Sequence, residues 1–185
     1  MRESIVRNYR VLHMAAHAAF GPSRAQESYI VMGDGSRLTT DDIDDMNRRL
    51  NNLHLVILSA CQTALGGSDG DGSEIAGISS YFLGQRNSRA ETVIASLWAV
   101  NDLSTSVLMQ RFYAILATGE FTKAEALRQA QLSLLYGEDV DALSTRLGET
   151  RTDASPQLRP GVEPPDVGHR HPFHWAPFIL IGNGF

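Results

Sequence analysis

The feature that most constrains the fold of this chain is a set of short apolar runs in which polar residues do not alternate. The strongest run spans residues 53–60 and is rich in Leu, Val and Ile, and others span residues 10–16, 92–97 and 177–181. Runs of this length and continuity are typical of strands that are covered on both faces, as in parallel sheets. We therefore expect an α/β protein with a largely parallel central sheet.

Helical patterns separate or follow these runs at residues 41–50, 73–83, 103–117 and 122–136. In the last of them, Thr122 and Glu125 have the spacing of a capping box, and Gly137 provides a stop. A smaller strand is expected at residues 28–32, because the Gly-Asp-Gly sequence that follows predicts a turn. Strands that alternate with helices again favour a parallel sheet.

Composition changes after residue 137. Residues 138–170 are polar and acidic, contain four prolines and have few large apolar groups. Such a segment buries too little apolar surface to offset the entropy of ordering it, so we expect a mobile loop within the domain. The length of 185 residues suits one hydrophobic core, and we expect a single domain over residues 1–185.

Charge and hydropathy exclude two classes of protein. Sixteen basic and 21 acidic residues give a net charge of −5, which argues against a nucleic-acid partner held through phosphate contacts. No apolar stretch approaches the roughly 20 residues that a membrane-spanning helix needs. The first residues do not resemble a secretory signal, so we expect a cytoplasmic protein with no membrane partner.

The single cysteine, Cys61, directly follows the strongest apolar run. A lone thiol excludes an internal disulfide and a multi-cysteine zinc site. Ligands collect at the carboxyl ends of strands in open α/β sheets, which favours a nucleophile at this position. The alternative is that Cys61 fills a small buried space, as free cysteines often do, and its position alone leaves both interpretations open.

His17 is the candidate partner of this thiol, because it follows the run at residues 10–16 as Cys61 follows its own run. If the two runs form neighbouring parallel strands, both side chains leave the same edge of the sheet. A thiol with the ordinary pKa of about 8.5 is mostly protonated at neutral pH, so nucleophilic attack needs a nearby base or imidazolium. A histidine can also protonate the leaving amine.

Other polar groups have more ordinary interpretations. His13 lies inside the first run, four residues before His17, and a metal site formed by the two is discounted because this spacing shares a face on a helix whereas the run predicts a strand. His54 opens the second run and is interpreted as structural. Three histidines near the C-terminus could hold zinc, but no cysteine remains to join them if Cys61 is catalytic. They are His169, His171 and His174. The acidic, glycine-rich stretch at residues 66–74 lacks the spacing of an EF-hand and is interpreted as a solvated turn.

Four ordered blocks of sequence resemble the CHAT domain, a caspase-like family that is often attached to tetratricopeptide repeats. The blocks are YRVLHMAAH at residues 9–17, LVILSACQT at 55–63, SLWAVND at 96–102 and HWAPFILIG at 174–182. The stretches FY at residues 112–113 and ALRQAQ at 126–131 fit the same pattern. The resemblance implies a caspase-like three-layer sandwich with a mostly parallel central sheet.

The resemblance also implies the cysteine endopeptidase mechanism of caspases, metacaspases and separase, acting on a protein or peptide substrate. His17 is then the dyad histidine and Cys61 the nucleophile, while the backbone N–H groups of Cys61 and Ala18 form the oxyanion hole. No metal, cofactor or third catalytic residue is implied. A tetratricopeptide-repeat or other regulatory region is the implied partner.

Two departures from the family pattern stand out. Relatives usually carry glycine after the dyad histidine, where this chain has Ala18, and positive φ is costly for alanine. Complete members also carry substantial sequence before the first block, whereas only eight residues precede Tyr9 here. We therefore expect the C-terminal portion of a CHAT domain that lacks its N-terminal part.

Trp98 and Asp102 follow the third apolar run, on the edge of the sheet that is expected to hold the dyad. Asp102 either caps the helix that begins near residue 103 or faces a substrate side chain. In separases, a similar Trp-containing segment carries an acidic residue associated with a basic residue before the scissile bond. The resemblance therefore implies that Asp102 and Trp98 bind substrate, with a preference for Arg or Lys.

Three functions are compatible with these residues. The first is peptide-bond hydrolysis by His17 and Cys61. The second is a non-catalytic or degenerate CHAT interaction module, in which an incomplete sheet docks on a partner through its open edge. The third is a hydrolase or acyltransferase that uses the same dyad on small molecules in an enclosed apolar pocket.

Overall fold

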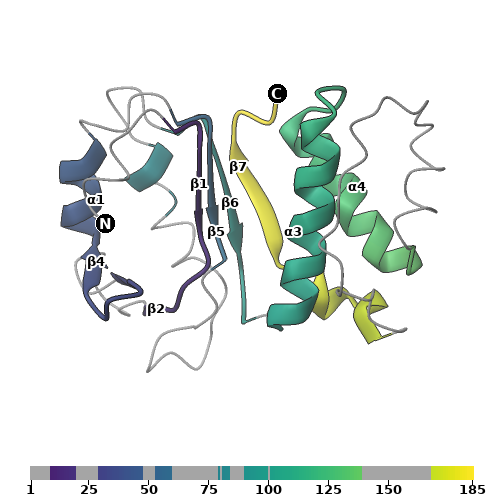
Figure 1. Cartoon of the computed structure of the whole chain (residues 1–185), viewed down its shortest axis with the longest axis horizontal. Helices are drawn as coiled ribbons and strands as arrows, with labels where there is room; N and C mark the ends of the chain where they lie inside the picture. The colour runs from purple at the N-terminus through teal and green to yellow at the C-terminus, as the bar shows by residue number, and fades with distance from the viewer. Residues whose placement is uncertain are drawn as a thin grey trace. The chain divides into compact units, whose positions relative to one another are not determined.

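The structure is a computed structural model that describes residues 9–19, 29–47, 53–59, 79, 81–83, 90–99, 101–138 and 168–185. The chain divides into two compact units. The first comprises residues 1–99 and 178–183, and the second comprises residues 100–177 and 184–185. Figure 1 labels most of the helices and strands of the two units.

The first unit is built on a four-stranded sheet with the strand order β1-β5-β6-β7 (Figure 1). The strands are β1 (Val11–Met14), β5 (Leu55–Leu58), β6 (Thr92–Ser96) and β7 (Phe178–Gly182). β1, β5 and β6 run parallel to one another, and β7 pairs antiparallel with β6 at the edge. These strands confirm the predicted α/β class and the mostly parallel sheet; β1, β5 and β6 are shorter than their apolar runs, and β7 is shifted by one residue from its run.

The central strands explain why their sequences are continuously apolar. Every residue of β5 and of β6 is buried, so both faces of these strands are covered. β1 is an edge strand of this sheet, and three of its four residues keep part of their surface accessible. The contrast follows from position, because a central parallel strand has no face turned to water.

One face of this sheet contributes alternate side chains to the main hydrophobic cluster of the unit. These side chains are Leu12 and Met14 of β1, Val56 and Leu58 of β5, and Val93 and Ala95 of β6. They pack with Phe82 and Ile43, which are almost fully buried. Since successive side chains of a strand point to opposite faces, His13 lies on the other face of the sheet.

A second, three-stranded antiparallel sheet has the order β2-β3-β4. Its strands are β2 (Ala18–Ala19), β3 (Tyr29–Val31) and β4 (Arg37–Thr39). β3 confirms the small strand predicted at residues 28–32, and Gly35 closes the turn after it with φ of +79° and an amide that donates to Met32 O over 2.8 Å. β2 and β4 were not predicted, because two or three residues are too few to show a pattern.

Helix α1 (Thr40–Asn47) follows β4 directly. Thr39 and Asp42 form a reciprocal cap at its start, since Thr39 Oγ1 accepts from the Asp42 amide over 3.2 Å and Asp42 Oδ2 accepts from the Thr39 amide over 3.0 Å. This confirms the helix predicted at residues 41–50, whose last three residues lie outside the described part of the chain. In the helix predicted at residues 73–83, the described residues 79 and 81–83 are helical.

The second unit contains the packed helix pair α3 (Asp102–Ala117) and α4 (Lys123–Tyr136). α4 begins and ends as its sequence predicts: Thr122 Oγ1 accepts from the Glu125 amide over 3.2 Å, and Gly137 adopts the left-handed conformation with φ of +66°. The cap of α3 differs from expectation. Asn101, not Asp102, is the N-cap, and its side chain accepts from the amides of Leu103 and Ser104.

Two short 3-10 helices complete the second unit, η2 (Gly168–Arg170) and η3 (Pro172–His174). η2 occupies the last three residues of the segment 138–170, which we expected to be a mobile loop. Residues 139–167 of that segment lie outside the described residues, so the prediction stays open for them. No helix in the described ranges is long and apolar enough to cross a membrane.

Candidate functional site

The parallel pairing of β1 with β5 sets the geometry of the candidate site. Met14, the last residue of β1, is in register with Leu58, the last residue of β5. The ladder continues one step further, because the Ser59 amide donates to Met14 O over 3.0 Å. His17 follows Met14 by three residues, and Cys61 follows Leu58 by the same number in the sequence. Cys61 itself lies outside the described residues.

His17 is exposed at the end of the segment that leaves β1. Its backbone is held by the second sheet, since its carbonyl oxygen accepts from the Val31 amide over 2.7 Å. This bond joins the loop after β1 to β3. The backbone of His17 is therefore fixed by a hydrogen bond, while its imidazole remains accessible to solvent.

Ala18 lies in β2 opposite Ile30 and is 3 % exposed. The bond from the Val31 amide to the His17 carbonyl identifies Ala18–Ile30 as a non-hydrogen-bonded pair of the antiparallel ladder. The amide N–H of Ala18 therefore points away from β3. Strand backbone is extended, which alanine adopts freely, so this position does not require the glycine that relatives carry.

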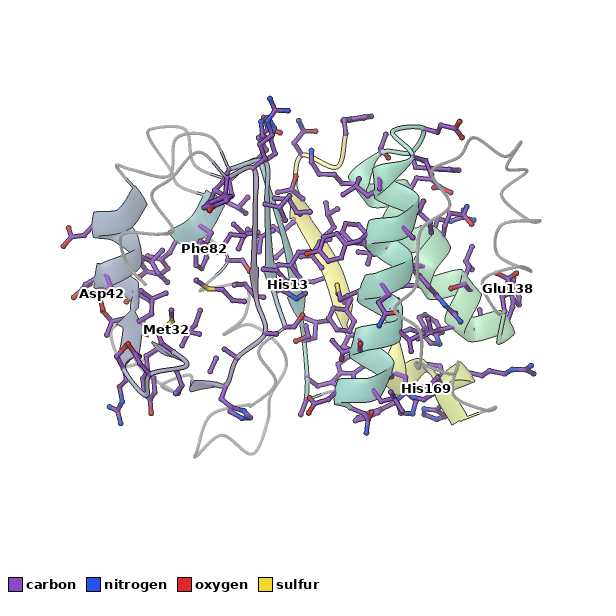
Figure 2. The ribbon with its side chains drawn as sticks, in the orientation of Figure 1. His13, Met32, Asp42, Phe82, Glu138 and His169 are labelled. Carbon is purple, nitrogen blue, oxygen red and sulfur yellow. The ribbon has the colours of Figure 1, made fainter. Side chains whose placement is uncertain are left out.

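Sequence reasoning missed a contact next to these residues. His13 Nε2 lies 3.1 Å from Ser59 Oγ, and Ser59 is 8 % exposed. In Figure 2, His13 projects from β1 on the side of the sheet opposite to Phe82 and Met32. Burial of part of its ring lowers the pKa of His13 below the ordinary value of 6.5, although the residue keeps accessible surface because β1 is an edge strand. The sequence carried one signal of this contact, a histidine between Leu12 and Met14 in an apolar strand.

Trp98 and Asp102 belong to different units. Trp98 lies two residues after β6 in the first unit and is partly buried. Asp102 is the exposed first residue of α3 in the second unit, where its negative charge interacts favourably with the helix dipole. The interpretation of Asp102 as the helix cap is wrong, because both amides that a cap would satisfy are bound by Asn101.

The remaining histidines have structural contacts. His54 Nδ1 lies 3.1 Å from Glu91 Oε2, and the two side chains are 45 % and 44 % exposed. His171 accepts the Phe173 amide at its Nδ1 over 3.2 Å and so caps η3. The rings of His169 and His174 lie 4.9 Å apart between centroids, and His174 Nδ1 is 3.2 Å from Ser104 Oγ.

Metal-ligand chemistry was considered for two segments of the sequence. Within the described ranges, no three side chains of His, Cys, Asp or Glu come together as a metal site requires. This includes His169, His171 and His174. The acidic stretch at residues 66–74 lies outside those ranges.

Comparison with known proteins bears on the whole chain. No curated protein matches it. The CHAT domain family matches residues 1–183, a range that spans both compact units and all four blocks that suggested the resemblance. The chain therefore belongs to the CHAT domain family, a caspase-like and peptidase-related group of α/β domains.

Proposed function

We propose that this chain is a caspase-like cysteine endopeptidase in which Cys61 is the nucleophile and His17 the acid–base partner. The observation that carries the proposal is the register of β1 with β5, which pairs Met14 with Leu58. His17 and Cys61 each follow these paired residues by three positions. Equal offsets from the paired ends of two parallel strands favour a meeting of the two side chains at one edge of the sheet.

The chemistry would proceed in two stages. Cys61 Sγ, as the thiolate, attacks the carbonyl carbon of the scissile peptide bond, and His17 gives a proton to the departing amine as the C–N bond breaks. The resulting thioester is then hydrolysed by water, which loses a proton to His17 as it attacks the thioester carbonyl; the C–S bond breaks, the acid product leaves, and the Cys61 thiolate and the protonated His17 are regenerated. Two groups are sufficient for these proton transfers, so no metal or cofactor enters the scheme.

Backbone amides would stabilise the oxyanion that forms at each stage. The N–H groups of Ala18 and Cys61 are the proposed donors. For Ala18, support comes from the non-hydrogen-bonded pairing with Ile30, which leaves its amide outside the β2–β3 ladder. Because only the amide is needed, the methyl group of Ala18 does not by itself argue against activity.

We propose in addition that Asp102, together with Trp98, selects a basic residue before the scissile bond. Asn101 supplies the helix cap of α3, so the carboxylate of Asp102 is not required for capping. Asp102 is exposed and therefore accessible to a charged substrate side chain. An acidic side chain at this position suits Arg or Lys, because opposite charges attract and Arg binds carboxylates in bidentate geometry.

The test of the peptidase proposal is cleavage of a peptide library by the full chain, read by mass spectrometry. We expect wild-type protein to cut peptides, Cys61→Ala to cut none, and His17→Ala to be slower by roughly 100-fold or more. His54→Ala is the matched control, because His54 is another accessible histidine of the first unit but precedes β5 instead of following a strand end. It should cleave as wild type does.

Two results would support the other functions instead. Turnover of small esters or amides without cleavage of any peptide would indicate a small-molecule hydrolase. Identical binding of protein partners by wild type and Cys61→Ser, without cleavage of either peptides or partners, would indicate an interaction module.

The specificity proposal has its own test. Cleavage after Arg or Lys should fall at least about 100-fold in Asp102→Asn if a desolvated charge pair forms, since breaking such pairs costs roughly 3–5 kcal/mol. Asn101 remains as the cap in this variant, so α3 should stay folded. A wild-type profile without basic preference, or one that Asp102→Asn leaves unchanged, would contradict the proposal.

A further inference from the structure

The contact between His13 and Ser59 links the two chain segments that lead to the proposed catalytic pair. Ser59 is bound to β1 twice, since its amide donates to Met14 O over 3.0 Å and its Oγ lies 3.1 Å from His13 Nε2. In the sequence, Ser59 precedes Cys61 by two residues and His13 precedes His17 by four. The side-chain hydrogen bond between Ser59 and His13 therefore adds to the backbone hydrogen bonds at the point where the pairing of β1 with β5 ends.

The chemistry of the pair favours a persistent hydrogen bond. Ser59 is 8 % exposed, and a buried hydroxyl without a partner is costly. Partial burial of the ring lowers the pKa of His13, which favours the neutral imidazole, and Nε2 can donate or accept according to its tautomer. The strand register supports the same geometry, because His13 pairs with Ile57 and Ser59 is the next residue on that face of β5.

We propose that His13 and Ser59 are positioning residues that fix the separation of the chain segments carrying His17 and Cys61. This inference rests on the proposed peptidase function. Ser59 is not itself a nucleophile in this scheme, in which Cys61 attacks the substrate. We expect the pair to act through the backbone, and the distance that it controls is the one between the Cys61 thiol and the His17 imidazole.

The experiment is the pH dependence of Cys61 alkylation by iodoacetamide between pH 5.5 and 9.5, measured on the full chain. Cys61 is the single cysteine, so the modification reports on one site. We expect His13→Ala and Ser59→Ala each to slow alkylation at pH 7 by about tenfold or more, because an error of about 1 Å in placement can cost about 100-fold. Each should also raise the midpoint of the profile toward the ordinary thiol value of about 8.5.

Rescue and non-additivity separate positioning from loss of stability. His13→Gln keeps a hydrogen-bonding group near the place of Nε2, so it should react within about threefold of wild type. The double variant His13→Ala/Ser59→Ala should react as slowly as either single variant, since each single variant already removes the same hydrogen bond. Circular dichroism confirms folding, and Ser59→Ala, which removes one buried oxygen atom, carries the test if His13→Ala does not fold.

Each outcome discriminates between the two proposals. If His17→Ala slows alkylation while His13→Ala and Ser59→Ala do not, the positioning role is overturned and the proposed function stands. If effects of the single variants add, or His13→Gln is as slow as His13→Ala, the positioning role is likewise overturned. If His17→Ala leaves the profile unchanged, the proposed function has failed and the positioning role falls with it.

Discussion

Histidines gather in two regions of this chain, and the regions differ in what surrounds the rings. In the strand-end region, defined by His13, His17, Ala18 and Ser59, one imidazole bonds a buried hydroxyl and another is exposed after the same strand. In the C-terminal histidine region, defined by His169 and His174, the rings contact each other, and His174 bonds Ser104 of α3. Figure 2 labels His13 in the first region and His169 in the second.

The difference shows that proximity of histidines does not define a reactive site. The bonds of the C-terminal histidine region belong to packing: His174 bonds Ser104 of α3, Gln131 of α4 donates to Trp175 O over 3.1 Å, and the Trp175 indole donates to Arg170 O over 3.1 Å. The strand-end region instead presents an accessible imidazole, His17, at the end of the segment that leaves β1. Changes in the second unit should therefore alter stability and leave the reactivity of Cys61 unchanged.

The largest effect is expected at Arg111, which is 5 % exposed within the second unit. Its Nη1 donates to Ser133 Oγ over 2.8 Å, and its Nη2 donates to the carbonyl oxygen of Glu138. Arg111→Ala leaves the buried Ser133 hydroxyl and the partly buried Glu138 carbonyl without this donor, so we expect the free energy of unfolding to fall by about 3 kcal/mol. Urea unfolding measures the loss.

The control for this prediction is Arg128→Ala. Arg128 lies on the surface of α4 and forms an ion pair with Glu125 at 3.0 Å, and its side chain is 62 % exposed. Exposed pairs contribute about 0–1 kcal/mol, so this variant should be near wild type. A loss at Arg111 no larger than that at Arg128 would contradict the structural role, as would a change in Cys61 alkylation under conditions where the variant is folded.

A smaller effect is expected from Gly137→Ala at the end of α4. Its φ of +66° is unfavourable for alanine, and an added Cβ would meet the end of the Arg170 side chain. Gly119→Ala is the matched comparison, because its φ is +73° but nothing lies within 4 Å of an added Cβ. We expect about 1 kcal/mol for each variant, because positive φ is unfavourable for alanine and the exposed end of the Arg170 side chain can move away from an added Cβ. A loss at Gly137 that exceeds the loss at Gly119 by about 1 kcal/mol or more would show that Arg170 is held against the end of α4.

The N-terminus of α3 offers a similar comparison between neighbours. Asn101 Oδ1 accepts from the Leu103 amide over 2.8 Å, so Asn101→Ala should cost about 1 kcal/mol in thermal unfolding. Asp102→Asn removes only a charge near the helix dipole and should cost about 0.5 kcal/mol. If Asp102→Asn lowers the stability of the protein more than Asn101→Ala does, Asp102 and not Asn101 is the residue that caps α3.

The smallest effect concerns pH. Burial, followed by the nearby charges of His174 and Arg111, lowers the pKa of His169 below 6.5. The unfolded chain then binds a proton at higher pH than the folded chain does, so the contribution of His169 is complete above about pH 6.5 and decreases as pH falls below it. We expect the thermal midpoint to fall between pH 7.5 and pH 5, and His169→Gln to remove part of this dependence.

His171→Asn is the control for the pH experiment. His171 is exposed and caps η3 through its Nδ1, and asparagine also caps helices well. This variant should keep the dependence of wild type. An unchanged pH dependence in His169→Gln would show that His169 titrates alike in folded and unfolded chains.

The sequence predicted those elements whose pattern is long enough to be seen. The apolar runs of β5 and β6 predicted buried strands because both faces of each are covered. Thr122 and Gly137 predicted the ends of α4 because their caps use only local contacts. β2 and β4 escaped prediction, since strands of two or three residues are defined by pairing with distant residues and not by their own pattern.

The candidate site was predicted only in outline. The position of His17 after an apolar run was enough to make it a candidate. The contact between His13 and Ser59 could not be predicted in the same way, because it joins residues 46 apart and depends on the register of β1 with β5. Capping was one of two roles considered for Asp102, and the structure gives it to Asn101; asparagine and aspartate cap equally well, so local sequence does not choose between these neighbours. Register and cap choice are properties of the folded backbone.

The central claim is that His17 activates Cys61. The most direct measurement is the rate at which iodoacetamide modifies Cys61 at pH 7, followed by intact-protein mass spectrometry in wild type, His17→Ala and the control His54→Ala. Our account predicts that wild type and His54→Ala react alike and that both react at least about tenfold faster than His17→Ala, because an activated thiol is largely thiolate at this pH. Equal rates in all three proteins would contradict the account.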